Sequence, residues 1–81
     1  MDINPEAVRE EAVGYLRDLL RINTVNPPGN EIYACQYIAG VLAREGIECT
    51  IIESAPERGN LVARLRGNGQ AAALLLMVHL D

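Results

Sequence analysis

The residues best suited to metal chemistry stand at the end of the sequence, where His79 and Asp81 form a His-x-Asp pattern. They follow residues 74–78, an unbroken apolar run typical of a strand that is covered on both faces of a sheet. Side chains two positions apart in a strand share a face, so we expect His79 and Asp81 to point the same way. In open α/β sheets, ligands and metals bind at this end of the strands.

A neutral imidazole can ligate a metal, and a carboxylate beside it can orient the site. The pattern therefore makes His79 a candidate metal ligand and Asp81 a candidate catalytic-site carboxylate. On the pattern alone a purely structural interpretation is favoured, because His-x-Asp is short and common. In that interpretation a backbone carbonyl satisfies His79, and Asp81 simply begins a loop.

Composition limits the class of protein. A chain of 81 residues makes at most one small domain, and its hydrophobic content of 49% is ordinary for globular proteins and too high for disorder. A net charge of −4 without any basic stripe argues against a nucleic-acid partner. No apolar run approaches the roughly 18 residues of a membrane span, and the N-terminus lacks a secretory pattern. We therefore expect a cytoplasmic protein that binds neither nucleic acid nor membrane.

Two helices are predicted in the first half of the chain. The first covers residues 5–21, with Asn4 as N-cap and Pro5 at the first helical position. The second covers residues 31–45 and ends at Gly46, which suits a left-handed conformation. Each helix carries an apolar stripe that we expect to be buried, the first one against a sheet. The stripes are Val8, Ala12, Tyr15, Leu16 and Leu19, and then Ala34, Ile38, Val41 and Leu42.

Three strands are predicted to follow, at residues 47–53, 60–66 and 71–78. Their links are short, so neighbouring strands should pair antiparallel. The fold class is α/β, in the order α-α-β-β-β. The last strand has the composition of a central strand, yet nothing after it covers or flanks it, which suggests part of a larger domain.

Three segments together resemble one enzyme family. Residues 19–31 read LLRINTVNPPGNE, residues 52–54 and 58–63 read IES and RGNLVA, and residues 74–81 read LLLMVHLD. In this order and spacing they resemble the N-terminal segments of the co-catalytic zinc hydrolases. That family includes acetylornithine deacetylase, succinyl-diaminopimelate desuccinylase, aminoacylase, carnosinase-type dipeptidases and glutamate carboxypeptidase. Each segment alone is weakly specific, but the ordered set spans almost the whole chain.

The resemblance implies a function and a site. His79 would correspond to the first zinc-ligating histidine, and Asp81 to the active-site aspartate that steadies it. The fold implied is a three-layer α/β/α catalytic domain with a mixed sheet. The activity implied is zinc-dependent hydrolysis of an amide or peptide bond in a small N-acyl amino acid or peptide with a free carboxylate. Two zincs per subunit and a homodimer are implied for the full-length protein, and cobalt or manganese would suit the same ligands.

The resemblance also implies that residues 1–81 are the N-terminal portion of that catalytic domain, ending after the first metal motif. The bridging carboxylate, the Glu-Glu pair with the general base, a further acidic ligand, a second histidine and the dimerisation domain have no counterpart in these residues. We therefore expect the 81-residue chain itself to be inactive. The alternative hypothesis is a freestanding small α/β binding module without catalysis, in which His79 is incidental.

Two parts of the resembling segments are interpreted as structural. Residues 23–31 contain Pro27, Pro28 and Gly29, which exclude helix, so we interpret them as a rigid connector. The alternative is that this loop lines the rim of the active site. Arg58 and Asn60 are interpreted as a loop residue and a strand-start residue.

Overall fold

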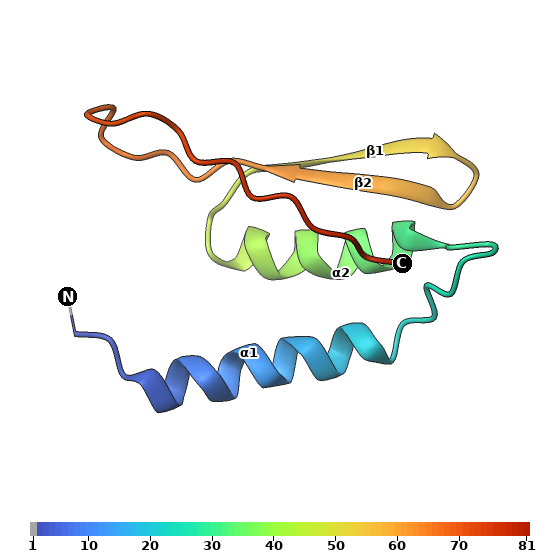
Figure 1. Cartoon of the computed structure of the whole chain (residues 1–81), viewed down its shortest axis with the longest axis horizontal. Coiled ribbons are helices and arrows are strands. Elements are labelled where there is room, and N and C mark those ends of the chain that lie inside the picture. Colours follow the sequence, from blue (N-terminus) through green and yellow to red (C-terminus); the bar gives the residue numbers. More distant parts are fainter. Residues whose placement is uncertain (1) are drawn as a thin grey trace.

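A computed structural model describes residues 2–81 and gives a small α/β fold (Figure 1). Its elements are helices α1 (Pro5–Leu20) and α2 (Glu31–Arg44) and strands β1 (Cys49–Ala55) and β2 (Arg58–Ala63). The two strands form one antiparallel sheet. Neither of the helices formed by these residues is long and apolar enough to cross a membrane.

The start of α1 confirms the predicted cap. The Asn4 side-chain oxygen accepts hydrogen bonds from the backbone N–H groups of Glu6 and Ala7, at 3.1 and 3.3 Å. These N–H groups have no acceptor inside the helix, so the Asn4 side chain supplies the acceptor that they lack. Pro5 occupies the first turn, as predicted, and Arg21 is the C-cap.

The predicted burial of the α1 stripe against a sheet is wrong. No residue of α1 is buried, and the stripe residues Val8 and Leu16 are more than half exposed. Figure 1 shows the reason, since α2 lies directly below the sheet and α1 lies below α2. The helices are joined by a hydrogen bond of 2.5 Å from the Tyr37 hydroxyl to the Asp18 carboxylate.

The small core lies where α2 packs on both strands. Its buried apolar side chains are Ile32, Ala34 and Cys35, all from the first turns of α2. Packing is close at Gly59 on β2, where a Cβ would lie 2.8 Å from Ile32 Cδ1 and 3.3 Å from Ile32 Cα, so a larger residue would force Ile32 to shift. The predicted end of α2 is confirmed, with Gly46 in the left-handed conformation at φ 72°.

The strand register places one apolar face towards α2. Ile51 lies opposite Leu61, and both are half-buried. Ile52 and Val62 point to the other face and are more than half exposed. The predicted antiparallel pairing is confirmed, but the predicted start of the second strand, Asn60, lies two residues inside β2.

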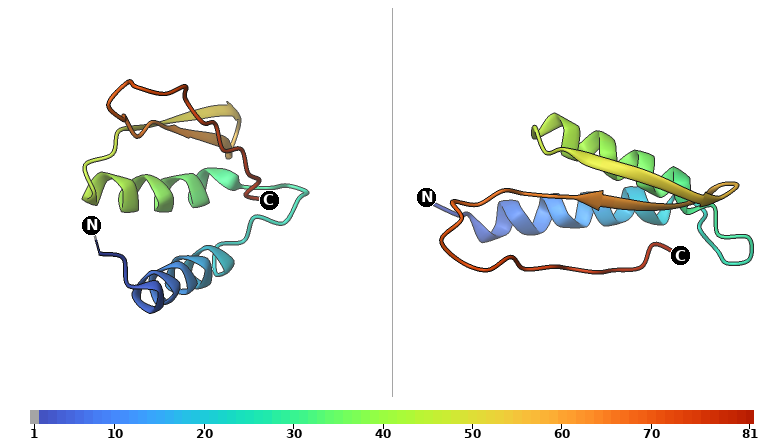
Figure 2. Two further views of the ribbon diagram at one scale, coloured as in Figure 1. Left: turned by 60° about the vertical axis from the view of Figure 1, so that its left-hand side comes forward. Right: turned by 90° about the horizontal axis from the view of Figure 1, so that it is seen from above.

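The third predicted strand is absent from the part of the chain described. Residues 64–81 form neither helix nor strand, and they double back beside β2 (Figure 2). The apolar side chains of residues 74–78 are 78–85% exposed instead of buried on both faces. The order is therefore α-α-β-β. Burial on two faces needs paired neighbouring strands and a layer on each side of the sheet, and residues 74–78 belong to no sheet.

Candidate functional site

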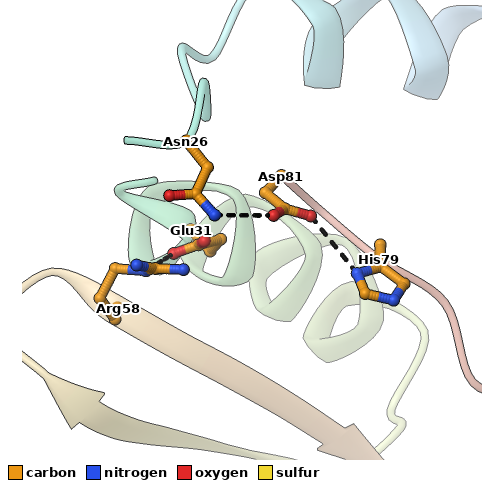
Figure 3. Close-up of polar contacts among 5 residues, drawn as sticks. All are labelled: Asn26, Glu31, Arg58, His79 and Asp81. Carbon is orange, nitrogen blue, oxygen red and sulfur yellow. Dashed lines mark hydrogen bonds and ion pairs between the residues drawn. The ribbon is translucent and has the colours of Figure 1, made fainter. Parts of the chain in front are cut away.

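His79 and Asp81 come together although no strand presents them. The His79 Nδ1 atom lies 3.4 Å from Asp81 Oδ1, and the other ring nitrogen points away from the carboxylate (Figure 3). The His79 side chain is 94% exposed, whereas that of Asp81 is 32% exposed. The pair is therefore an open imidazole that faces a more sheltered carboxylate on one side.

Asn26 is a second partner of Asp81. Its Nδ2 group donates a hydrogen bond of 3.2 Å to Asp81 Oδ2, so each carboxylate oxygen has its own partner (Figure 3). The Asn26 hydrogen bond, followed by the His79 contact, lowers the pKa of the Asp81 carboxyl below its ordinary value. Both contacts favour the ionised form, which is the form that can orient an imidazole.

An ion pair lies beside this group. Arg58 Nε donates to Glu31 Oε2 at 2.6 Å, and the Glu31 carboxylate is the one buried charged group of the described residues. Glu31 begins α2 and Arg58 begins β2, so the pair joins the starts of the two elements. The hydrogen bond from Arg58 lowers the pKa of Glu31, and the same bond raises the pKa of Arg58.

Gly29 lets the interhelical loop pass directly over this ion pair. A Cβ at Gly29 would lie 2.6 Å from Arg58 Nε and 2.6 Å from Glu31 Oε1, and its φ of 106° is one that L-residues rarely adopt. The Gly29 N–H donates to the Val25 carbonyl at 2.9 Å, which closes a turn around Asn26. The loop is therefore fixed at its glycine, and the turn presents the Asn26 amide to Asp81.

Sequence reasoning found His79 and Asp81 but missed Asn26, Glu31 and Arg58. The contact of Asn26 with Asp81 shows that residues 23–31 reach the candidate site as well as connecting the two helices. A clue was present, because all three missed residues lie within the segments that carry the family resemblance. Asn60, in contrast, is an exposed residue of β2, as expected for a strand position.

A groove adjoins His79 and Asp81. It has a volume of about 710 Å³ and lies between the C-terminal end of α1, residues 22–25 and residues 79–81. Its walls are largely apolar, with Leu16, Leu20 and Val25 among them, and Arg21 adds a cation. The groove is open to solvent, since Leu16, Leu20 and Val25 are all more than half exposed.

Of the groups that could hold a metal, the described site offers one imidazole with a carboxylate beside it. His79 offers a free ring nitrogen, while both oxygens of Asp81 are already engaged by Asn26 and His79. Within residues 2–81, no three side chains of His, Cys, Asp or Glu are grouped so that they could hold a metal. A catalytic zinc usually has about three protein ligands and a water.

The Glu31–Arg58 pair should make stability depend on pH. The folded state lowers the pKa of Glu31, so the ionised carboxylate contributes to the stability of the fold. This contribution to the free energy of unfolding is complete above the unfolded-state pKa of Glu31 and is lost as pH falls through its folded-state pKa. Arg58→Met removes the partner, so the variant should unfold more easily at neutral pH and lose less stability between about pH 6 and about pH 2.5. Urea unfolding across this range measures both effects.

The matched control for that experiment is Arg64→Met, because Arg64 is exposed and lies outside the strands. It should reproduce the pH dependence of the unaltered chain. Parallel loss of stability with acid in the Arg58→Met variant and in the unaltered chain would show that the pair does not stabilise the fold.

Comparisons with known proteins add no further assignment. No protein-family model matches this sequence, and neither a curated protein nor a solved structure matches the chain.

Proposed function

We propose that this chain is the N-terminal portion of the catalytic domain of a co-catalytic zinc hydrolase. The longer protein hydrolyses an amide or peptide bond in a small N-acyl amino acid or peptide. The single observation that carries the proposal is the His79–Asp81 pair, in which a carboxylate faces one ring nitrogen at 3.4 Å and leaves the other free. The ordered resemblance of the three segments supplies the reaction class.

The pair has the arrangement that a zinc-bound histidine needs. Metal-ligating histidines commonly donate a hydrogen bond from their second ring N–H to a carboxylate. This bond fixes the tautomer and raises the basicity of the metal-binding nitrogen. Asp81 faces that second nitrogen, and its carboxyl is ionised at neutral pH, so it can accept a hydrogen bond. His79 would thus be one zinc ligand, and Asp81 would orient it without touching the metal.

Bound zinc supplies Lewis-acid activation of the scissile carbonyl and of a water molecule. The residues of this chain have simpler tasks. His79 binds through its free nitrogen, Asp81 holds the ring, and Asn26 holds Asp81. The other ligands and the general base would come from sequence that follows Asp81.

The groove beside the pair supports a small substrate with a carboxylate. Leu16, Leu20 and Val25 offer an apolar wall for an acyl group or side chain, and Arg21 offers a cation for a carboxylate. Substrates of the resembled family combine an amide with a free carboxylate. N-acyl amino acids and short peptides therefore fit both the resemblance and the lining of the groove.

The exposed apolar run of residues 74–78 also supports the proposal of a larger domain. Five consecutive apolar side chains that are 78–85% exposed are unusual for a finished surface. In a three-layer α/β/α domain with a mixed sheet, further strands and helices would cover these side chains. The run would then become the central strand that its composition predicts.

The test is an activity screen of the full-length protein, loaded with zinc, against N-acyl amino acids and dipeptides. We expect hydrolysis of at least one of these substrates, loss of activity with a chelator, and no hydrolysis by the 81-residue chain alone. The same preparation should contain two metals per subunit. A full-length protein that binds no metal and hydrolyses none of these amides would contradict the proposal.

The alternative function is a small α/β binding module without catalysis. The observation that favours it is the same exposed apolar run, which would then be a contact surface. The two functions differ in what His79 does. A binding module would keep its partner and its affinity after His79→Ala, whereas a zinc hydrolase would lose metal.

A further inference from the structure

We propose that Asn26 is a positioning residue for the metal-binding histidine. It fixes the Asp81 carboxylate so that His79 keeps its proton on Nδ1 and leaves the Nε2 lone pair free. The inference rests on the proposed function for its purpose, but its geometry comes from contacts within this chain. It gives a specific role in the site to the interhelical loop, which the sequence analysis interprets as a connector, with lining of the site rim as the alternative.

The first step is the division of the two Asp81 oxygens. Oδ2 accepts from Asn26 Nδ2 at 3.2 Å, and Oδ1 faces His79 Nδ1 at 3.4 Å. A carboxylate on an otherwise free side chain can rotate and exchange its oxygens between partners. With Oδ2 held by an amide from a distant part of the chain, Oδ1 stays directed at the imidazole (Figure 3).

The second step is that Asn26 itself is held. The Gly29 N–H to Val25 carbonyl bond closes the turn that contains Asn26, and the Val25 N–H donates to the Asn23 side chain at 3.1 Å. Gly29 then rests on the Glu31–Arg58 ion pair, where a Cβ has no room. The amide is thus carried by a loop anchored on the start of α2 and the start of β2.

The third step is the choice of side chain. An asparagine donates an N–H to a carboxylate without adding charge to the site. An aspartate of nearly the same shape would lose the donor and repel Asp81, and an alanine would leave Oδ2 to water. Asn26→Asp and Asn26→Ala should therefore have the same direction of effect for different physical reasons.

The tautomer of His79 gives a direct test of the 81-residue chain. The sequence contains a single histidine, so ¹⁵N-histidine labelling reports on His79 alone, in solution or in sedimented protein. At about pH 9, well above the usual range for imidazole titration, the ¹⁵N shifts give the ratio of the two neutral forms. We expect the Nδ1–H form to dominate in the unaltered chain. In Asn26→Ala and Asn26→Asp that ratio should fall about 2- to 10-fold, the equivalent of one net hydrogen bond.

Asn68→Ala is the matched control, because the Asn68 side chain bonds only to the nearby Gln70, through its amide and its carbonyl oxygen. It should leave the ratio unchanged, and circular dichroism should show the same helix content in all variants. An unchanged ratio in both Asn26 variants, or an unaltered chain without preference for Nδ1–H, would overturn the inference. Neither result depends on catalysis, so an inactive full-length protein would contradict the proposed function while leaving the role of Asn26 intact.

Discussion

Replacing His79 by alanine in the full-length protein should remove most of the proposed hydrolytic activity and one of the two metals that the proposed function requires. His79 offers the one imidazole of the described site, with its second nitrogen already engaged by Asp81. A site that loses one of about three protein ligands no longer holds zinc firmly. Because a metal contributes several kcal/mol to such a reaction, we expect turnover to fall at least about 100-fold. Metal analysis and steady-state kinetics on the same preparation measure both effects.

Two further variants make that result specific. His79→Cys keeps a zinc-binding side chain, so it should retain more metal than His79→Ala. Glu48→Ala alters an exposed residue between α2 and β1 and should change neither metal content nor turnover. If His79→Ala kept two metals per subunit and normal turnover, the assignment of His79 as a ligand would be wrong.

Local sequence rules predicted the parts of the fold that depend on local interactions. Asn4 and Pro5 begin α1 for local reasons. The Asn4 side-chain oxygen accepts from unpaired N–H groups of the first turn, and the φ of Pro5 is fixed near its helical value. Gly46 ends the second helix because it adopts a positive φ at little cost. The hairpin followed from short links and alternating apolar residues, and its strands shifted by only about two residues. Such features need no knowledge of the tertiary structure.

Features that depend on a distant partner were not predicted correctly. The apolar stripe that includes Val8 and Leu16 indicates that α1 could bury one face. It does not indicate that α2, and not α1, packs against the sheet. Residues 74–78 have the composition of a central strand, yet composition does not supply the neighbouring strands and the two covering layers. In both cases the periodicity describes what a segment could bury, and the available partners decide what it does bury.

The candidate site divides in the same way. His79 and Asp81 are two residues apart, so their association could be expected from sequence. Asn26 reaches Asp81 from 55 positions away, and Arg58 reaches Glu31 across 27 positions. No local rule predicts those contacts, because they depend on the interhelical loop folding back over the start of β2. Gly29 permits the close approach of the loop to Arg58 and Glu31, but together with the two prolines it predicted only the absence of helix.

Replacing Asp81 by alanine should weaken the site without dismantling it. Asp81 touches the imidazole and not the proposed metal, so its loss frees the ring to rotate and to change tautomer. Carboxylates in this position typically contribute about 10- to 100-fold in metal affinity or activity, and we expect a loss of that size in the full-length protein. Metal affinity measured by competition with a chelator, together with kcat and KM, gives the comparison with His79→Ala.

Asp81→Asn separates the shape of the side chain from its charge. The amide keeps one oxygen, which can accept a hydrogen bond from either Asn26 or His79, but it is neutral and accepts more weakly than a carboxylate. The loss of metal affinity in Asp81→Asn should therefore be smaller than in Asp81→Ala. Asp2→Ala, at an exposed position before α1, is the control for removing a carboxylate in general. Unchanged metal affinity together with unchanged turnover in Asp81→Ala would exclude the orienting role. A loss as complete as that of His79→Ala would instead make Asp81 a metal ligand, because only the removal of a ligand should empty the site.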